Sequence, residues 1–226
     1  MRRSVPSSTS TKRAASSGSP DAVIDTVVLR YFLLVDEIDL LLKLVGSPPA
    51  VPRIVYDPDE AEDTPEDARS EITRSISYQR RAGDDPARGD SSRLDAAANA
   101  ARLARVVSLH AGGALIVLDL EDEELDLVGR LTSPTTCKEF GLRFPLDPGE
   151  SACLAIAVHR DFVLVTDDGD ALRALEQQRP GHPYERIRRL LIRAADSKLC
   201  TRKRANEIHA EMRRFGFWDR DAPFPA

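Results

Sequence analysis

Acidic residues stand at the ends of two predicted strands, and they are the side chains in this sequence best suited to chemistry. One short apolar run ends at Asp25, and a second, from Phe162 to Thr166, ends at Asp167 and Asp168. In an open parallel sheet, ligands bind in the crevice beyond the carboxyl ends of the strands. We therefore expect these acids to lie together at one edge of a sheet.

A further acid, Glu150, lies in the segment DPGESACLAIA. Asp147 can cap a helix there and Pro148 fits its first turn, so Glu150 would stand near the same edge if this helix leads into the second strand. Carboxylates held close together repel one another, and Mg²⁺ or Mn²⁺ relieves that repulsion by binding their oxygens. Such a cluster can activate water and stabilise charge on a phosphoryl group.

Each of these acids also has a purely structural explanation. Asp147 and Glu150 fit a variant of the capping box, which by itself accounts for the glutamate. Asp25, Asp167 and Asp168 can each serve as a helix N-cap, a position that favours aspartate. Their joint placement is therefore what favours a functional site.

The elements that must position these acids alternate between strand and helix. Apolar residues follow a helical period from Val27 to Val45, and Gly46 ends it. Strands are expected at 115–118 and 162–166, helices at 65–81, 91–110, 170–177, 184–195 and 201–215, and residues 51–56 fit either a strand or the entry to a helix. This alternation predicts an α/β fold with three layers, α/β/α, around a central parallel sheet. The helices between about residues 60 and 113 are expected to form an insertion.

The chain has 226 residues and a net charge of −5, and its charges are unevenly distributed. Residues 1–20 contain four basic residues, many serines and threonines and no acid, which predicts a disordered tail; a transit peptide has a similar composition. Residues 186–214 contain ten basic residues and three acids. Such a region can bind a phosphate backbone, or it can be a solvated helix surface.

Several function classes lack their sequence signals. The three cysteines, Cys137, Cys153 and Cys200, lie far apart, and no histidine pair has the spacing of a zinc site. No glycine-rich phosphate loop with its lysine is present, and no apolar stretch approaches the ~18 residues that a membrane-spanning helix needs. We therefore expect a cytoplasmic protein without a membrane partner.

Three blocks of the sequence resemble PIN-domain ribonucleases, particularly the small prokaryotic proteins that include VapC-type toxins. The blocks are Val23–Gly46, Leu146–Leu175 and Arg188–Trp218, and they match the opening Asp-Thr segment, the Gly-Glu helix with its T-x-D strand, and a C-terminal helical extension. The resemblance implies a PIN-like domain over residues 21–180 and a helical extension over residues 181–226.

The resemblance also implies roles for four acids: Asp25, Glu150 and Asp168 as catalytic ligands of Mg²⁺ or Mn²⁺, and Asp167 as an additional ligand. The family often has another acid after a V-P-x-x-V segment, where VPRIVYDPDE has Pro58. Asp57 is the candidate to replace that acid, and Asp59 and Glu60 are alternatives.

The activity that the resemblance implies is cleavage within single-stranded RNA, with water attacking phosphorus, in a toxin that an antitoxin protein would inhibit. Basic residues of the C-terminal helices are expected to contact the RNA backbone: Arg189, Arg193, Arg202, Lys203 and Arg204. The sequence leaves open whether the chain forms a homodimer. The alternative hypothesis, which Pro58 favours, is a catalytically inactive PIN-like module that binds RNA or a partner protein.

Overall fold

The chain folds around a five-stranded sheet in which every strand is parallel to its neighbours. The computed structural model describes residues 20–46, 48–61 and 63–225, so residues 1–19 of the predicted tail lie outside the described residues. The strands are β1 (Ala22–Ile24), β2 (Ala50–Pro52), β3 (Ile116–Leu118), β4 (Val163–Val165) and β5 (Tyr184–Glu185), in the spatial order β3-β2-β1-β4-β5.

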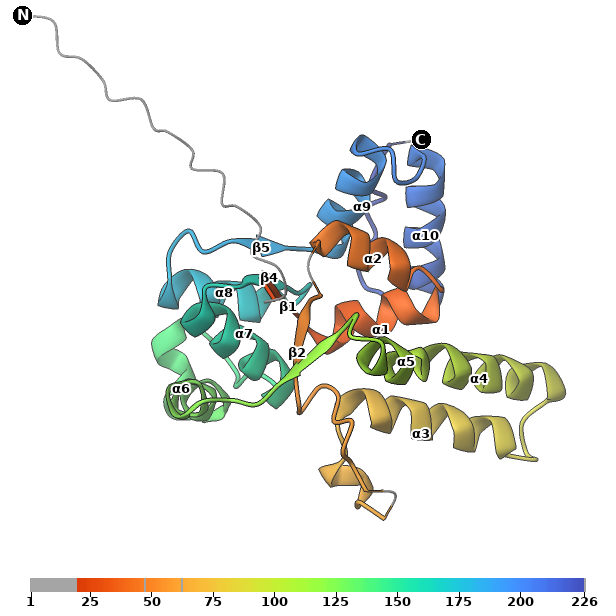
Figure 1. The fold of residues 1–226 in the computed structure, drawn as a ribbon, viewed down its shortest axis with the longest axis horizontal. Helices are drawn as coiled ribbons and strands as arrows, with labels where there is room; N and C mark the ends of the chain where they lie inside the picture. The colour runs from red at the N-terminus through yellow and green to blue at the C-terminus, as the bar shows by residue number, and fades with distance from the viewer. Residues whose placement is uncertain (1–19, 47, 62, 226) are drawn as a thin grey trace, which may run out of the picture.

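Helices cover both faces of the sheet, which confirms the predicted three-layer α/β/α fold (Figure 1). One face carries α6 (Asp122–Thr132), α7 (Pro148–Arg160) and α8 (Gly169–Gln178), and α7 contacts β1, β2 and β4 directly. The other face carries α1 (Thr26–Leu34), α2 (Ile38–Val45), α9 (Ile187–Asp196) and α10 (Arg202–Arg214). Short 3₁₀ helices, η1 (Glu66–Ala68) and η2 (Cys137–Phe140), lie in the connections. No helix of the described residues is long and apolar enough to cross a membrane.

The strand order places β1 in the middle of the sheet. The chain runs from β1 through β2 to β3 at one edge and then returns to add β4 on the other side of β1. Every residue of β1 and β2 is buried, as expected for parallel strands covered on both faces. The carboxyl ends of β1 and β4 form the topological switch point, where open α/β sheets bind their ligands.

The helical period predicted from Val27 to Val45 belongs to two helices, α1 and α2. Asp36, between them, has a left-handed backbone with a φ of 60°, a conformation that aspartate tolerates better than most residues. Phe32 before the break and Leu41 after it are both fully buried. The apolar pattern therefore continues through the break because both helices contribute to the same core.

Three helices between β2 and β3 occupy the region predicted as an insertion. They are α3 (Glu71–Asp84), α4 (Asp90–Leu103) and α5 (Arg105–Ala111), and α3 packs against α4 in a hairpin that extends away from the sheet (Figure 1). The Glu71 N–H donates to the Ile54 carbonyl and the Ile72 N–H to the Val55 carbonyl, both at 3.0 Å. These bonds fix the start of α3 beside the carboxyl end of β2.

The segment predicted as a helix from Tyr184 to Ala195 begins instead with β5. Tyr184 pairs with Leu164 and Glu185 pairs with Val165, both in β4. The helical part of the C-terminal region therefore begins at Ile187 rather than at residue 181, and the residues before it complete the sheet.

Candidate functional site

Asp25 lies at the centre of the candidate site, directly after β1, and is 1% exposed. Its backbone N–H donates to the Val165 carbonyl at 3.0 Å, which fixes it beside the end of β4. The Thr166 hydroxyl donates to Asp25 Oδ2 at 2.9 Å, whereas Oδ1 is buried without a hydrogen-bond partner among the described residues. A buried carboxylate oxygen without a partner is unfavourable unless a ligand binds it.

Thr166 connects Asp25 to Asp168. While its hydroxyl donates to Asp25, the same oxygen accepts a hydrogen bond from the Asp168 N–H at 3.1 Å. Asp168 also caps α8, because its Oδ1 accepts from the Ala171 N–H at 2.6 Å. The T-x-D spacing thus has a physical reason, because Thr166 at the end of β4 makes hydrogen bonds with both Asp25 and Asp168.

Glu150 lies in the first turn of α7, as predicted, and is partly buried. Its pKa is raised to about 8, first by burial and then by the charges of Asp168, Asp25 and Asp147. The Asp147 backbone N–H favours the ionised glutamate, which is one half of a capping box, but the Asp147 side chain makes no capping hydrogen bond. Capping therefore explains only part of the position of Glu150, whereas its interaction with the other acids places it in the same group.

A fourth acid, Glu71, joins this group and was not predicted from the sequence. It is the first residue of α3, and the Thr26 hydroxyl at the start of α1 donates a hydrogen bond to its carboxylate. An acid was expected near Pro58, whereas Glu71 lies further along the chain because a loop and η1 separate β2 from α3. The available signal was Ser70-Glu71 within the helix predicted over 65–81, since serine is favoured as an N-cap and acids are favoured in a first helical turn.

Gly149 allows Glu71 to approach α7. A Cβ atom at position 149 would lie 2.4 Å from Glu71 Oε1, far closer than non-bonded atoms tolerate. A larger residue would therefore displace the Glu71 carboxylate. Both residues of the Gly-Glu pair contribute to the candidate site, because Gly149 leaves room for the Glu71 carboxylate and Glu150 supplies a carboxylate of its own.

The four acids form a group of interacting negative charges, which we call the acid group: Asp25, Glu71, Glu150 and Asp168. The pKa of Asp25 is raised to about 7, first by burial and then by the charges of Glu71 and Asp168, whereas the hydrogen bonds of the Thr166 hydroxyl and the Thr26 N–H act in the opposite direction. Among the ion pairs of the described residues, none involves a member of the acid group. Their repulsion is therefore not neutralised by a described lysine, arginine or histidine.

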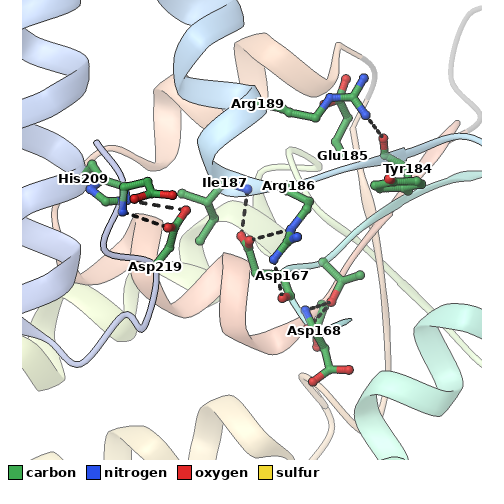
Figure 2. Close-up of polar contacts among 12 residues, drawn as sticks. Asp167, Asp168, Tyr184, Glu185, Arg186, Ile187, Arg189, His209 and Asp219 are labelled. Atoms are coloured by element: carbon green, nitrogen blue, oxygen red, sulfur yellow. Dashed lines mark hydrogen bonds and ion pairs between the residues drawn. The ribbon is translucent and has the colours of Figure 1, made fainter. Parts of the chain in front are cut away.

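Asp167 is not part of the acid group. Its Oδ2 accepts from the Ile187 N–H at 2.7 Å and its Oδ1 from Arg186 Nε at 3.1 Å, so its side chain points to the start of α9 and away from that of Asp168 (Figure 2). It satisfies an N–H at the beginning of α9 that would otherwise lack a partner. The structure therefore gives Asp167 a structural position, and its predicted role as an additional ligand is not supported.

Asp57 also lies outside the acid group. Its Oδ1 accepts a hydrogen bond from Arg53 Nη1, and the same guanidinium binds Asp59 and Asp119. Asp57 is therefore neutralised in a cluster around Arg53, and Glu71 rather than Asp57 interacts with Asp25.

The predicted RNA-binding residues divide into two sets. Arg193 binds Glu185 and the Leu44 carbonyl, both at 2.7 Å, and Arg204 binds Glu37 at 2.7 Å, so these two arginines attach α9 and α10 to β5 and α2. The other three have exposed side chains: Arg189, Arg202 and Lys203. Arg189 and Lys203 make only long ion pairs, with Glu185 at 3.7 Å and with Glu207 at 3.9 Å, so this second set is freer to contact a ligand backbone.

The acid group offers only oxygen ligands, which suit Mg²⁺ or Mn²⁺. The described residues nevertheless include no group of three or more Asp, Glu, His or Cys side chains arranged to hold a metal ion as they stand. Hydrogen bonds hold three of the carboxylates, to Thr166 for Asp25, to the Ala171 N–H for Asp168 and to Thr26 for Glu71. Asp25 Oδ1 is the buried oxygen that fits a cation, because no described group binds it.

Comparison with known proteins found no match to the chain: no protein-family model matches it, and neither the curated proteins nor the solved structures contain a match. The resemblance to PIN-domain ribonucleases therefore stays a prediction from the sequence.

Proposed function

We propose that this protein is a PIN-like, divalent-metal-dependent ribonuclease that hydrolyses phosphodiester bonds of single-stranded RNA. The observation that carries the proposal is the acid group itself: acids that follow β1 and β4 interact with acids in the first turns of α3 and α7 at the switch point of a parallel sheet. Structural carboxylates usually have basic or N–H partners, whereas Asp25 keeps one buried oxygen unpaired. Such an arrangement is typical of a site that needs negative charge.

Each acid has a distinct part in the proposed site. Asp25 is fixed by Thr166 and presents Oδ1, and Asp168 presents the oxygen that does not cap α8. Glu71 and Glu150 lie on helices, and their longer side chains can turn toward Asp25. When bound, Mg²⁺ or Mn²⁺ supplies a water of lowered pKa and stabilises charge on the phosphoryl oxygens. No side-chain nucleophile is required.

The choice of RNA as substrate comes from the sequence resemblance, and the exposed basic residues of α9 and α10 support it. Arg189, Arg202 and Lys203 can bind phosphates without regard to base sequence. A VapC-type toxin that acts in the cytoplasm and is inhibited by an antitoxin protein is part of the same proposal, as is a homodimer. An antitoxin would act by covering the edge of the sheet where the acid group lies.

The test is cleavage of single-stranded RNA by the purified full chain with Mg²⁺ or Mn²⁺, compared between Asp168→Asn and Asp170→Asn. Asparagine is also a good N-cap, so the first variant should keep α8 intact. We expect its cleavage rate to fall by about 10²-fold or more, as when one charge-stabilising group is removed from an active site. Asp170 lies two residues further along the chain and binds Arg173, so its variant should cleave like the wild type. Equal rates for both variants would remove Asp168 from the site.

A second candidate function is a catalytically inactive module that binds RNA or a partner protein. The observation that favours it is that the acids are not arranged to hold a metal ion as they stand. Metal titration separates the candidates, because ligand binding to the folded state raises its melting temperature. A nuclease should gain stability with Mn²⁺ in the wild type but much less in Asp168→Asn, whereas an inactive module should gain equally little in both.

A further inference from the structure

Arg186 and Trp218 lie against each other at the carboxyl end of β5, the strand that pairs with β4. The Arg186 guanidinium carbon is 5.4 Å from the centre of the Trp218 ring. Arg186 follows β5 and Trp218 follows α10, so the fold brings together residues that are distant in the sequence. Trp218 is 59% exposed, although it is a large aromatic residue. The pair therefore presents an aromatic surface and a cation to solvent.

Hydrogen bonds fix Arg186 next to the residue that precedes Asp168. Its Nε donates to Asp167 Oδ1 at 3.1 Å and its Nη2 to the Asp167 carbonyl at 3.2 Å (Figure 2). Its Nη1 makes no hydrogen bond with any described residue, and its side chain is 32% exposed. Arg186 thus has a free donor at the edge of the sheet where phosphate would be cleaved.

Trp218 is held by the residues on each side of it. Phe217 is buried and makes edge-to-face contacts with Tyr31, at 5.2 Å between ring centres, and with His209, at 5.5 Å. Asp219 points toward His209 (Figure 2), so its carboxylate is directed into the protein rather than toward solvent. An aromatic ring that is already positioned loses little conformational freedom when a ligand stacks on it.

The geometry points to a subsite for one unpaired nucleotide next to the cleaved phosphate, with its base stacked on Trp218 and its phosphate bound by Arg186. The subsite rests on the proposed function, because the acid group is the reason to expect a nucleic acid strand at this edge. Every base can stack on an indole ring, and the free Nη1 of Arg186 can donate a hydrogen bond to a phosphate oxygen. Bases inside a duplex are already stacked, so the subsite favours single-stranded RNA.

Trp218 is the only tryptophan of the chain, so its fluorescence reports on this place alone. The full chain is titrated, in EDTA, with a short 2′-O-methyl RNA that cannot form a duplex, with an abasic strand of the same length, and with polyphosphate. We expect saturable quenching by the RNA and little by the other two, which carry the charge without the bases. Absence of quenching by RNA, or equal quenching by polyphosphate, would overturn the subsite.

Binding of labelled RNA by Trp218→Ala, Trp218→Phe and Leu94→Ala then tests the stacking. Base stacking on an aromatic residue contributes about 1–3 kcal/mol, so Trp218→Ala should bind roughly fivefold or more weakly, and phenylalanine should restore part of the loss. Leu94 is 71% exposed on α4 and serves as the control for losing an exposed apolar side chain. Equal affinity of the two alanine variants would contradict the proposal.

The subsite and the proposed nuclease can fail separately, because both binding experiments are done without metal. RNA that quenches Trp218 but is never cleaved would support the subsite in an RNA-binding protein that is not a nuclease. Metal-dependent cleavage with the same KM in wild type and Trp218→Ala would support the nuclease and overturn the subsite. Trp218 fluorescence that changes with protein concentration but not with RNA would also overturn it, because the ring would then lie between two copies of the chain.

Discussion

Burial favours the protonated forms of Asp25 and Glu150 when no cation is bound. The pKa of Asp25 is raised from 3.8 to about 7 and that of Glu150 from 4.5 to about 8, in both cases first by burial. Between about pH 4 and pH 8 the folded protein therefore binds more protons than the unfolded chain. Because the folded state prefers the protonated acids, the metal-free protein should lose stability as the pH rises through this window.

Replacing Glu150 with glutamine should flatten this loss of stability. Glutamine is close in shape to the protonated acid but cannot ionise, so Glu150→Gln should match the wild type near pH 4 and be more stable than it at pH 8. Thermal denaturation in EDTA from pH 4 to pH 9 measures the difference. Glu123→Gln is the control, because Glu123 is 86% exposed and lies outside the acid group. Parallel curves for wild type and Glu150→Gln would contradict the raised pKa of Glu150.

Adding a single methyl group at Gly149 should displace Glu71 without unfolding the protein. The clash is with the end of a flexible side chain, and alanine has a better helix propensity than glycine, so Gly149→Ala should not lower the melting temperature. Its Mn²⁺ affinity should fall by about tenfold or more, which is typical when the support of a metal ligand is lost. Metal affinity is measured by calorimetric titration.

Gly129→Ala provides the matched control for that variant. Gly129 lies inside α6, and a Cβ atom there would meet nothing within 4 Å. This variant should gain about 0.5–1 kcal/mol of stability from helix propensity and keep its Mn²⁺ affinity. If both alanine variants bind Mn²⁺ like the wild type, Gly149 has no part in placing Glu71.

At the scale of the elements, the end of α9 offers a test of how the C-terminal helices are terminated. Lys198 follows the helix with a left-handed backbone, φ 60°, and the Leu199 N–H donates to the Ala194 carbonyl across the turn at 2.9 Å. Glycine adopts this conformation without a Cβ clash, so Lys198→Gly should stabilise the protein by about 1 kcal/mol. Lys198→Ala keeps the Cβ atom and should gain nothing. Chemical denaturation of both variants decides whether strain at this residue is real.

The sequence predicted the elements better than their connections. The central strands were predicted because β1 and β4 are apolar runs that end in acids, and strand alternating with helix implied the parallel sheet. β5 was missed, because two residues that pair with β4 have no periodicity of their own. The break at Asp36 was missed because the apolar pattern of one core continues across it.

The candidate site was predicted in part for the same reason. Asp25, Glu150 and Asp168 follow strands or begin a helix, so local pattern and sheet topology together place them at one edge. Glu71 depends on the length of the loop after β2, which sequence pattern does not determine. Asp167 and Asp168 are neighbours just after β4, so their side chains point in opposite directions. The Asp167 side chain binds the N–H at the start of α9, and the sequence pattern does not reveal this tertiary contact.

At the scale of the whole molecule, protons and metal ions compete for the same acids, so the stabilisation by Mn²⁺ should depend on pH. Near pH 6 a cation must displace protons from Asp25 and Glu150, and each displaced proton changes the apparent affinity by about tenfold per pH unit. The rise in melting temperature at a fixed Mn²⁺ concentration should therefore be small at pH 6 and much larger at pH 8.

This pH dependence distinguishes the acid group from adventitious binding to the many surface carboxylates. Exposed acids are ionised throughout this range, since their ordinary pKa values lie near 4, so metal bound to them would stabilise the protein to a similar extent at pH 6 and pH 8. Asp168→Asn removes one ligand of the proposed site and should lose most of the increase at pH 8. Wild type and Asp168→Asn that respond alike at both pH values would show that the four acids do not bind metal together, and the ribonuclease proposal would lose its chemical basis.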